Sequence, residues 1–146
     1  AKDLLLMNPD GTDLVNLTPA GTDDDSPTWS PDGSRIAFNT GPENQPLESD
    51  IAVVNPDGSG RIVLTNNPGF DLSPSWSADG SRIVFESSAT GNSEIFVMNA
   101  DGTGQMNLTN RPGAHDTEPD WSRGSGSPTA VRLATNAREL WEQLER

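Results

Sequence analysis

The stretch at residues 26–38, SPTWSPDGSRIAF, returns at residues 73–85 as SPSWSADGSRIVF. In both copies a short run with a tryptophan and a run that ends in phenylalanine flank the dipeptide Asp-Gly. Asp-Gly between apolar runs is a strong signal for a tight hairpin turn, because glycine adopts positive φ angles without strain. The duplicated stretch is therefore predicted to form the first two strands of a repeated antiparallel unit.

A single period extends this repeat over most of the chain. The segments DLLLMNPDG, DIAVVNPDG and EIFVMNADG begin at residues 3, 50 and 94, which are steps of 47 and 44 residues. Two dipeptides keep the same spacing: Leu17-Thr18, Leu64-Thr65 and Leu108-Thr109, and Trp29-Ser30, Trp76-Ser77 and Trp121-Ser122. A period of this length, built from short apolar runs and turn signals, indicates the blades of a β-propeller rather than helical repeats.

The composition favours an all-β protein and excludes some partners. The 146 residues include 14 glycines and 12 prolines, which suit many turns between short strands, and no cysteine. No apolar run is long enough for a membrane span and residues 1–20 lack the pattern of a secretion signal, so we expect a soluble chain without membrane insertion. The net charge of −13 repels phosphate backbones, so nucleic acid is not an expected partner.

Four strands are predicted in each full blade. In the first full blade they lie at residues 27–30, 34–39, 50–55 and 61–65. Along the chain the pattern begins with the last two strands of a blade, continues with two full blades and ends with a first strand at residues 119–122. VRLAT at residues 131–135 aligns with SRIAF and predicts a twelfth strand, if the preceding turn is five residues longer. The alternative is a helix that begins near residue 129 and includes VRLAT.

The predicted fold is thus an all-β propeller of four-stranded antiparallel blades, about three per chain, over residues 1–135. Residues 136–146, NARELWEQLER, break the pattern. Asn136 and Glu139 have the spacing of a capping box, and an apolar stripe follows at Leu140, Trp141 and Leu144. These residues predict a short C-terminal amphipathic helix, which either covers an exposed blade edge or docks a partner.

The repeat resembles the propeller repeat of the TolB family. The resemblance rests on D-x-x-P-x-W-S-x-D-G-S-R-I-x-F, then on D/E-I-x-V-M/V-N-x-D-G-x-G and Leu-Thr, and covers Asp3 to about Trp121. It implies a propeller, six-bladed in TolB itself, that serves as a protein-interaction platform in the bacterial periplasm or outside the cell. The same repeat also occurs in accessory domains beside catalytic domains.

Three blades are too few to close a ring, because propellers have about four to eight blades. An open arc leaves sheet edges and the faces between blades exposed. One interpretation is that two copies join head to tail into a six-bladed ring, in which each junction blade takes two strands from each chain. The other is that the chain is a fragment of a longer propeller protein.

Candidate binding residues lie where the loops are expected to surround the channel mouth. Asp24, Asp71 and Asp116 each stand three residues before a proline at the start of the first strand of a blade. Two interpretations remain open: each carboxylate accepts backbone N–H groups and shapes its loop, or the carboxylates form a ring that attracts a cation such as Ca²⁺ or a basic segment of a partner. Asp25 and His115 lie in the same loops and complete the candidate set.

No grouping of catalytic residues is recognisable in the sequence. His115 is the only histidine, and no nucleophile elbow, phosphate loop or dinucleotide fingerprint is present. The sequence therefore predicts a non-catalytic binding or scaffold module that requires no cofactor and presents an acidic loop face to a protein partner. The alternative is an accessory propeller domain of a larger enzyme or transport-associated protein.

Overall fold

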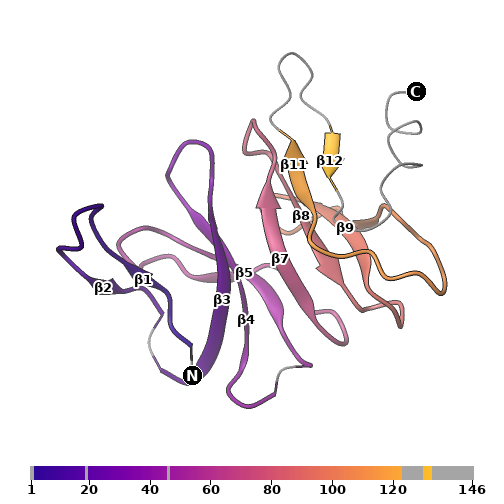
Figure 1. The fold of residues 1–146 in the computed structure, drawn as a ribbon, viewed down its shortest axis with the longest axis horizontal. Coiled ribbons are helices and arrows are strands. Elements are labelled where there is room, and N and C mark those ends of the chain that lie inside the picture. The colour runs from indigo at the N-terminus through magenta and orange to yellow at the C-terminus, as the bar shows by residue number, and fades with distance from the viewer. Residues whose placement is uncertain (1, 19, 46, 123–129, 133–146) are drawn as a thin grey trace.

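The computed structural model describes residues 2–18, 20–45, 47–122 and 130–132, which form a series of small antiparallel β-sheets (Figure 1). The strands are β1 (Leu5–Leu6), β2 (Val15–Asn16), β3 (Thr22–Trp29), β4 (Ile36–Pro42), β5 (Asp50–Val54), β6 (Ile62–Val63), β7 (Asp71–Trp76), β8 (Arg82–Ser87), β9 (Glu94–Asn99), β10 (Met106–Asn107), β11 (Asp120–Ser122) and β12 (Ala130–Arg132).

The sheets follow the predicted order of blades. Strands β3 to β6 form one four-stranded meander and β7 to β10 form a second, whereas β1–β2 and β11–β12 are two-stranded. The all-β propeller fold is confirmed, with two complete blades between two half blades. The predicted helix at residues 136–146 lies outside the described residues. Within the part of the chain that is described, no helix is long and apolar enough to cross a membrane.

The first strand of each full blade is longer than predicted, because a bulge carries it past a proline. Strand β3 starts at Thr22 rather than near residue 27, and its register with β4 shifts between Asp25 and Thr28. Ser26, inside the bulge, has a φ of 54°. Proline has no N–H to donate to a ladder, and an irregularity in the pairing accommodates it. The equivalent shift in β7 lies between Leu72 and Ser75.

The Asp-Gly dipeptides form the predicted turns. In the β3–β4 turn, Oδ1 of Asp32 accepts hydrogen bonds from the hydroxyls of Ser30 and Ser34, at 2.7 and 2.8 Å, and from the N–H of Ser34. Gly33 has a φ of 71°, where glycine is favoured. The hydrogen bonds to Ser30 and Ser34 lower the pKa of Asp32 to about 2. Asp79 is held in the same way and its pKa is also lowered to about 2.

The hydrophobic core lies between successive sheets, since side chains on the two faces of each strand pack against different neighbours. One cluster joins β1–β2 to the first full blade through Leu4, Leu17, Ile36, Phe38, Ala52 and Val54. A second joins the two full blades through Ala37, Ile51, Val53, Trp76, Ile83, Phe85 and Met98. Ile36, Phe38, Ile83 and Phe85 belong to these clusters, and all four are at most 3% exposed.

The last sheet corrects the predicted register of the twelfth strand. Residues 130–132 form a strand antiparallel to β11, so the alternative of a helix from residue 129 is wrong for these residues. Trp121 pairs with Val131, whereas Trp29 and Trp76 pair with Ile36 and Ile83. Val131 therefore takes the position of Ile36, two residues away from the position that the alignment of VRLAT with SRIAF assigned to it. A shift of two residues keeps each residue on the same face of the strand, so the sequence pattern could not exclude it.

Candidate functional site

The three repeated aspartates lie at the joints between blades and are buried. Asp24 is inside β3, Asp71 begins β7 and Asp116 precedes β11. Their exposures are 2%, 0% and 2%. Each is therefore part of the packed interior and not an exposed carboxylate at a channel mouth.

A main-chain hydrogen bond at each aspartate ties its blade to the one before. The N–H of Asp24 donates to the carbonyl of Lys2 at 2.8 Å, and that of Asp71 to the carbonyl of Ser49 at 2.7 Å. The N–H of Asp116 donates to the carbonyl of Ser93 in the same way, at 2.9 Å. Each acceptor comes directly before the acidic residue that opens the DLLLMN-type segment. The D-x-x-P motif therefore marks a repeated joint between neighbouring blades.

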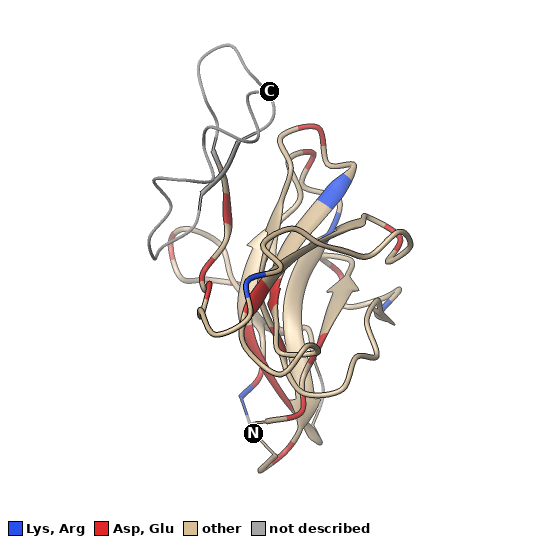
Figure 2. Cartoon of the chain, turned by 90° about the vertical axis from the view of Figure 1, so that its right-hand side faces the viewer, with Lys and Arg blue, Asp and Glu red and all other residues tan. Residues whose placement is uncertain are grey.

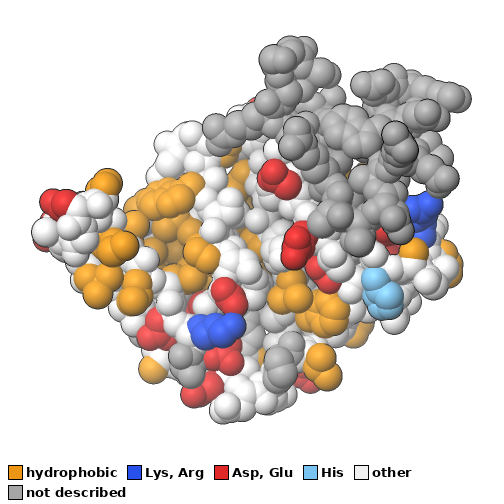
Figure 3. Space-filling view, in the orientation of Figure 1, with side chains coloured by type: hydrophobic (Ala, Val, Ile, Leu, Met, Phe, Trp, Pro, Cys, Tyr) orange, Lys and Arg blue, Asp and Glu red, His pale blue; other side chains and the backbone are white. Residues whose placement is uncertain are grey.

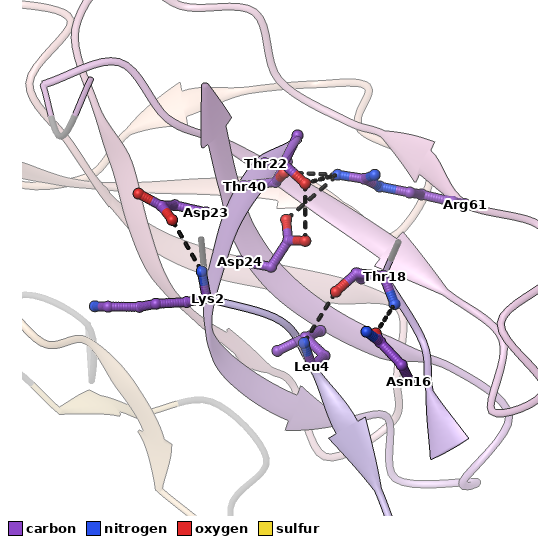
Figure 4. A network of polar contacts seen from close by, with 9 residues as sticks. All are labelled: Lys2, Leu4, Asn16, Thr18, Thr22, Asp23, Asp24, Thr40 and Arg61. Carbon is purple, nitrogen blue, oxygen red and sulfur yellow. Dashed lines mark hydrogen bonds and ion pairs between the residues drawn. The ribbon is translucent and has the colours of Figure 1, made fainter. Parts of the chain in front are cut away.

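The side chain of Asp24 is held by a polar network (Figure 4). Oδ2 of Asp24 accepts a hydrogen bond from the hydroxyl of Thr22 at 2.9 Å, and Oδ1 lies 3.3 Å from Nη2 of Arg61. The same nitrogen donates to the hydroxyl of Thr40 at 2.6 Å, and the guanidinium lies 5.7 Å from the centre of the Phe38 ring. The buried carboxylate thus has an ion-pair partner, which the sequence did not reveal because Arg61 is 37 residues away along the chain.

The other two aspartates have different surroundings. Oδ2 of Asp71 accepts a hydrogen bond from the side-chain amide of Asn67 at 2.8 Å. Burial raises the pKa of Asp71, although the hydrogen bond from Asn67 acts in the opposite direction. Oδ2 of Asp116 is buried and has no hydrogen-bond partner among the described residues. The repeat therefore preserves the backbone joint and not one common side-chain site.

Asp25 and His115 are exposed and lie in different joints. Asp25 forms an ion pair with Lys2 at 2.7 Å, and the hydrogen bond from Lys2 is the main reason that the pKa of Asp25 is lowered. Nδ1 of His115 accepts a hydrogen bond from the N–H of Ser93 at 3.4 Å. Among the described residues no three His, Cys, Asp or Glu side chains are grouped so that they could hold a metal ion.

Glu94 is a buried carboxylate that the sequence motifs did not single out as a candidate. Glu94 is 1% exposed and accepts hydrogen bonds from the hydroxyl of Thr90 at 2.6 Å, the N–H of Arg111 at 2.6 Å and the side-chain amide of Asn107. Burial alone would raise the pKa of Glu94, but these hydrogen bonds together lower it. The available signal was its place in the repeat, because Asp3 and Asp50 open the equivalent segments.

Hairpin turns of the two full blades line a cavity of about 600 Å³. Its wall includes Trp76, Arg35 and the turn residues Ser30, Asp32 and Asp79. The serine hydroxyl donates to a carboxylate whose pKa is about 2, and such a carboxylate is too weak a base to activate a nucleophile near neutral pH. We therefore find no catalytic arrangement among these residues.

The half blade at the start of the described chain has an uncovered apolar face. Leu5 and Met7 are 57% and 59% exposed, although Ala52 and Val54, at the equivalent positions of the next blade, are fully buried. Figure 3 shows apolar side chains gathered over β1, β2 and the adjoining part of β3. The side of β1 away from β2 has no partner strand in the described structure, whereas β5 pairs on both sides. The exposed face of Leu5 and Met7 marks where a preceding blade would pack, and the unpaired edge of β1 marks the place of the two missing strands.

Trp29 identifies the same place from the neighbouring blade. Trp76 is 8% exposed, packs in the cluster that contains Ala37 and Val53, and donates its indole N–H to the carbonyl of Thr28 at 3.3 Å. Trp29, at the equivalent position, is 48% exposed because the half blade before it lacks the strand that carries the equivalent of Ala37. Of the three described tryptophans at this position, Trp29 alone is exposed, and Trp121 is half-buried.

Repeated four-stranded antiparallel blades, joined in the same way at each step, define this protein as a β-propeller repeat protein. Residues 1–127 match the family model of the TolB beta propeller domain. The chain belongs to this family, and the resemblance inferred from the repeat is confirmed.

Solved structures agree with this assignment. TolB from Agrobacterium tumefaciens is 26% identical, with a TM-score of 0.66 over 80% of this chain and 40% of that one. TolB from Acinetobacter baumannii is 24% identical, with a TM-score of 0.69 over 92% of this chain and 35% of that one. An oligogalacturonate lyase from Vibrio parahaemolyticus shares the fold at 19% identity, with a TM-score of 0.54 over 80% of this chain and 35% of that one. The chain thus spans two fifths or less of these solved chains, and no curated protein sequence matches it.

Proposed function

We propose that this chain is a non-catalytic binding module of the TolB type, in which two copies assemble head to tail into one six-bladed ring. In each junction blade, β11 and β12 of one copy supply the first two strands, and β1 and β2 of the other supply the last two. The observation that carries this proposal is the difference in exposure between Trp29, at 48%, and Trp76, at 8%. The same residue in the same repeat position is buried only where the preceding blade is complete.

The size of the uncovered surface supports a closed dimer. Burying a large apolar side chain contributes about 1.5–3 kcal/mol, so covering Leu5, Met7 and half of Trp29 contributes roughly 5 kcal/mol at one junction. Association costs about 4–15 kcal/mol in lost rigid-body freedom. One junction alone is marginal against this cost. A ring of two copies has two identical junctions for a single loss of freedom, and three blades from each copy close a six-bladed ring.

The proposed partner is a protein with a basic surface. Asp and Glu lie in loops and turns at both ends of the blades, with few Lys and Arg among them (Figure 2). The excess of 22 acidic over 9 basic residues favours encounter with a cationic segment and opposes nucleic acid. Membership of the TolB propeller family supports a periplasmic or extracellular location for this interaction.

Sedimentation equilibrium at micromolar concentration tests the assembly. We expect a mass twice the 15.5 kDa of one chain. A mass of one chain at tens of micromolar would overturn the proposal. A mass that grows continuously with concentration would also overturn it, because a head-to-tail contact that does not close produces a filament.

The alternative is that the chain acts as part of a longer propeller, including one that accompanies an enzyme. It is favoured by the share of the solved chains that is covered, 40% and 35%, and by the fold shared with an oligogalacturonate lyase. A monomeric mass, together with a longer reading frame that supplies the missing strands, would establish this alternative.

A further inference from the structure

The internal repeat predicts the register of the junction blade, and this inference rests on the head-to-tail assembly proposed above. We propose that β12 pairs antiparallel with β1 of the second copy, with Val131 opposite Met7. We further propose that Trp29 of the second copy is buried against the first, with its indole N–H bonded to the carbonyl of Asp120. Together these contacts make a second copy of this chain the specific occupant of the uncovered face.

The ladder follows from two complete blades that agree with each other. In the first, Trp29 pairs with Ile36, which pairs with Val54. In the second, Trp76 pairs with Ile83, which pairs with Met98. Met7 occupies the position of Val54 and Met98, since the segments DLLLMN, DIAVVN and EIFVMN align without gaps.

The last sheet supplies the remaining link of the ladder. Trp121 pairs with Val131, so Val131 occupies the position of Ile36 and Ile83. Its partner in a complete blade is then Met7. The neighbouring pair is residue 132 with Leu6. No other in-register partner for β1 lies in the described part of the chain, because β4 and β8 already have partners on both sides.

The alternation of buried and exposed residues around β1 excludes a shift of one residue in this pairing. Leu4 is 5% exposed and packs with Leu17 and Phe38 in the cluster against the first full blade, whereas Leu5 and Met7 are exposed on the opposite face. A slip of one residue in the pairing would exchange the faces of the incoming strand relative to β1. The match of faces therefore selects one register among its immediate neighbours.

The inner strands provide the second half of the contact. Trp76 donates its indole N–H to the carbonyl of Thr28, the residue before the tryptophan of the preceding blade. For Trp29 in a closed ring, the equivalent acceptor is the carbonyl of Asp120 of the other copy. The hydroxyl of Ser75 donates to the Asp120 carboxylate at 2.9 Å, and Thr28 of the second copy carries an equivalent hydroxyl on the other side of Asp120. Asp120 would thus accept hydrogen bonds from both neighbouring blades.

Cysteine pairs test the register directly, because the chain has no cysteine of its own. We expect the variant Met7→Cys/Val131→Cys to form a covalent dimer under mild oxidation, visible on a non-reducing gel. The control is Met7→Cys/Ala130→Cys, in which adjacent strand residues point to opposite faces and the sulfurs cannot meet. Met7→Cys alone, measured under reducing conditions, shows how much of any change in the dimer comes from loss of the methionine side chain, which is 59% exposed in the single chain.

The outcomes separate this inference from the proposed function. A dimeric mass with a disulfide in Met7→Cys/Val131→Cys, and none in the control, supports both. A dimeric mass with no disulfide, or with a disulfide in the control only, overturns the register and leaves the assembly standing. A monomeric mass overturns both. As a second readout, we expect acrylamide quenching of tryptophan fluorescence to fall as the dimer forms, and unchanged quenching would overturn the burial of Trp29.

Discussion

Replacement of Trp29 by alanine is expected to weaken the dimer strongly while the single chain remains folded. The difference between 48% exposure for Trp29 and 8% for Trp76 is the fraction of the side chain that the junction would cover. For a side chain of about 250 Å² this is about 100 Å², or about 2.5 kcal/mol per junction. Two junctions lose about 5 kcal/mol, which raises the dissociation constant of the dimer by roughly 10³- to 10⁴-fold.

The measurement is sedimentation over a concentration series, with Leu47→Ala as the matched control. Leu47 is 71% exposed and lies in the loop between β4 and β5, away from the junction, so its loss should leave the dissociation constant unchanged. Far-ultraviolet circular dichroism checks that both variants keep their strands. If Trp29→Ala dissociates no more readily than Leu47→Ala, the tryptophan is not at the junction and the reasoning from its exposure is wrong.

Three further predictions concern the single chain. Thr65→Val should lower the free energy of unfolding by about 1–3 kcal/mol in urea titrations, because the Thr65 hydroxyl accepts a hydrogen bond from the buried N–H of Ile51 at 2.9 Å. Thr65→Ser keeps the hydroxyl and should recover most of this loss, and equal losses in the two variants would contradict the role of the hydroxyl. Asp71→Asn should raise the melting temperature at pH 7, because burial raises the pKa of Asp71 and ionisation of this carboxyl therefore disfavours the folded state. The gain in melting temperature should shrink as the pH falls and the wild-type carboxyl is protonated. A gain that does not depend on pH would show that ionisation of Asp71 is not its cause. Asp79→Asn should lower the melting temperature at neutral pH, because the pKa of Asp79 is lowered to about 2 and the ionised carboxylate stabilises the fold. The difference in melting temperature between variant and wild type should close as the pH falls from about 4 towards 2. A difference that stays constant would show that the charge of Asp79 is not responsible.

The strands and turns could be predicted from sequence because their causes are local. Asp-Gly dipeptides between apolar runs specify hairpins by backbone conformation alone, and the alternation of Ile36, Ala37 and Phe38 specifies a strand with two buried faces. Three copies of the same pattern then identified the blade and its strand order. The first strand was predicted too short, because the register shift near Ser26 and Pro27 depends on the partner strand.

The candidate site was harder to predict because burial is decided by segments that lie far apart in the sequence. Asp24 and Asp25 are adjacent acidic residues, yet one is buried against Arg61 and the other is exposed beside Lys2. Nothing local distinguishes them. Arg61 is far from Asp24 along the chain but contacts it in the folded blade, and only this contact shows which of the two carboxylates is buried.

The repeat alone determined the family, the order of strands and the incompleteness of the terminal blades, because each follows from short motifs read along the chain. The tertiary structure decided which tryptophan is uncovered and which register the last strand takes. Trp29 and Trp76 lie in nearly the same stretch of sequence, but a half blade precedes Trp29 whereas a complete blade precedes Trp76. That contact is made between segments of different blades, so it exists only in the folded molecule.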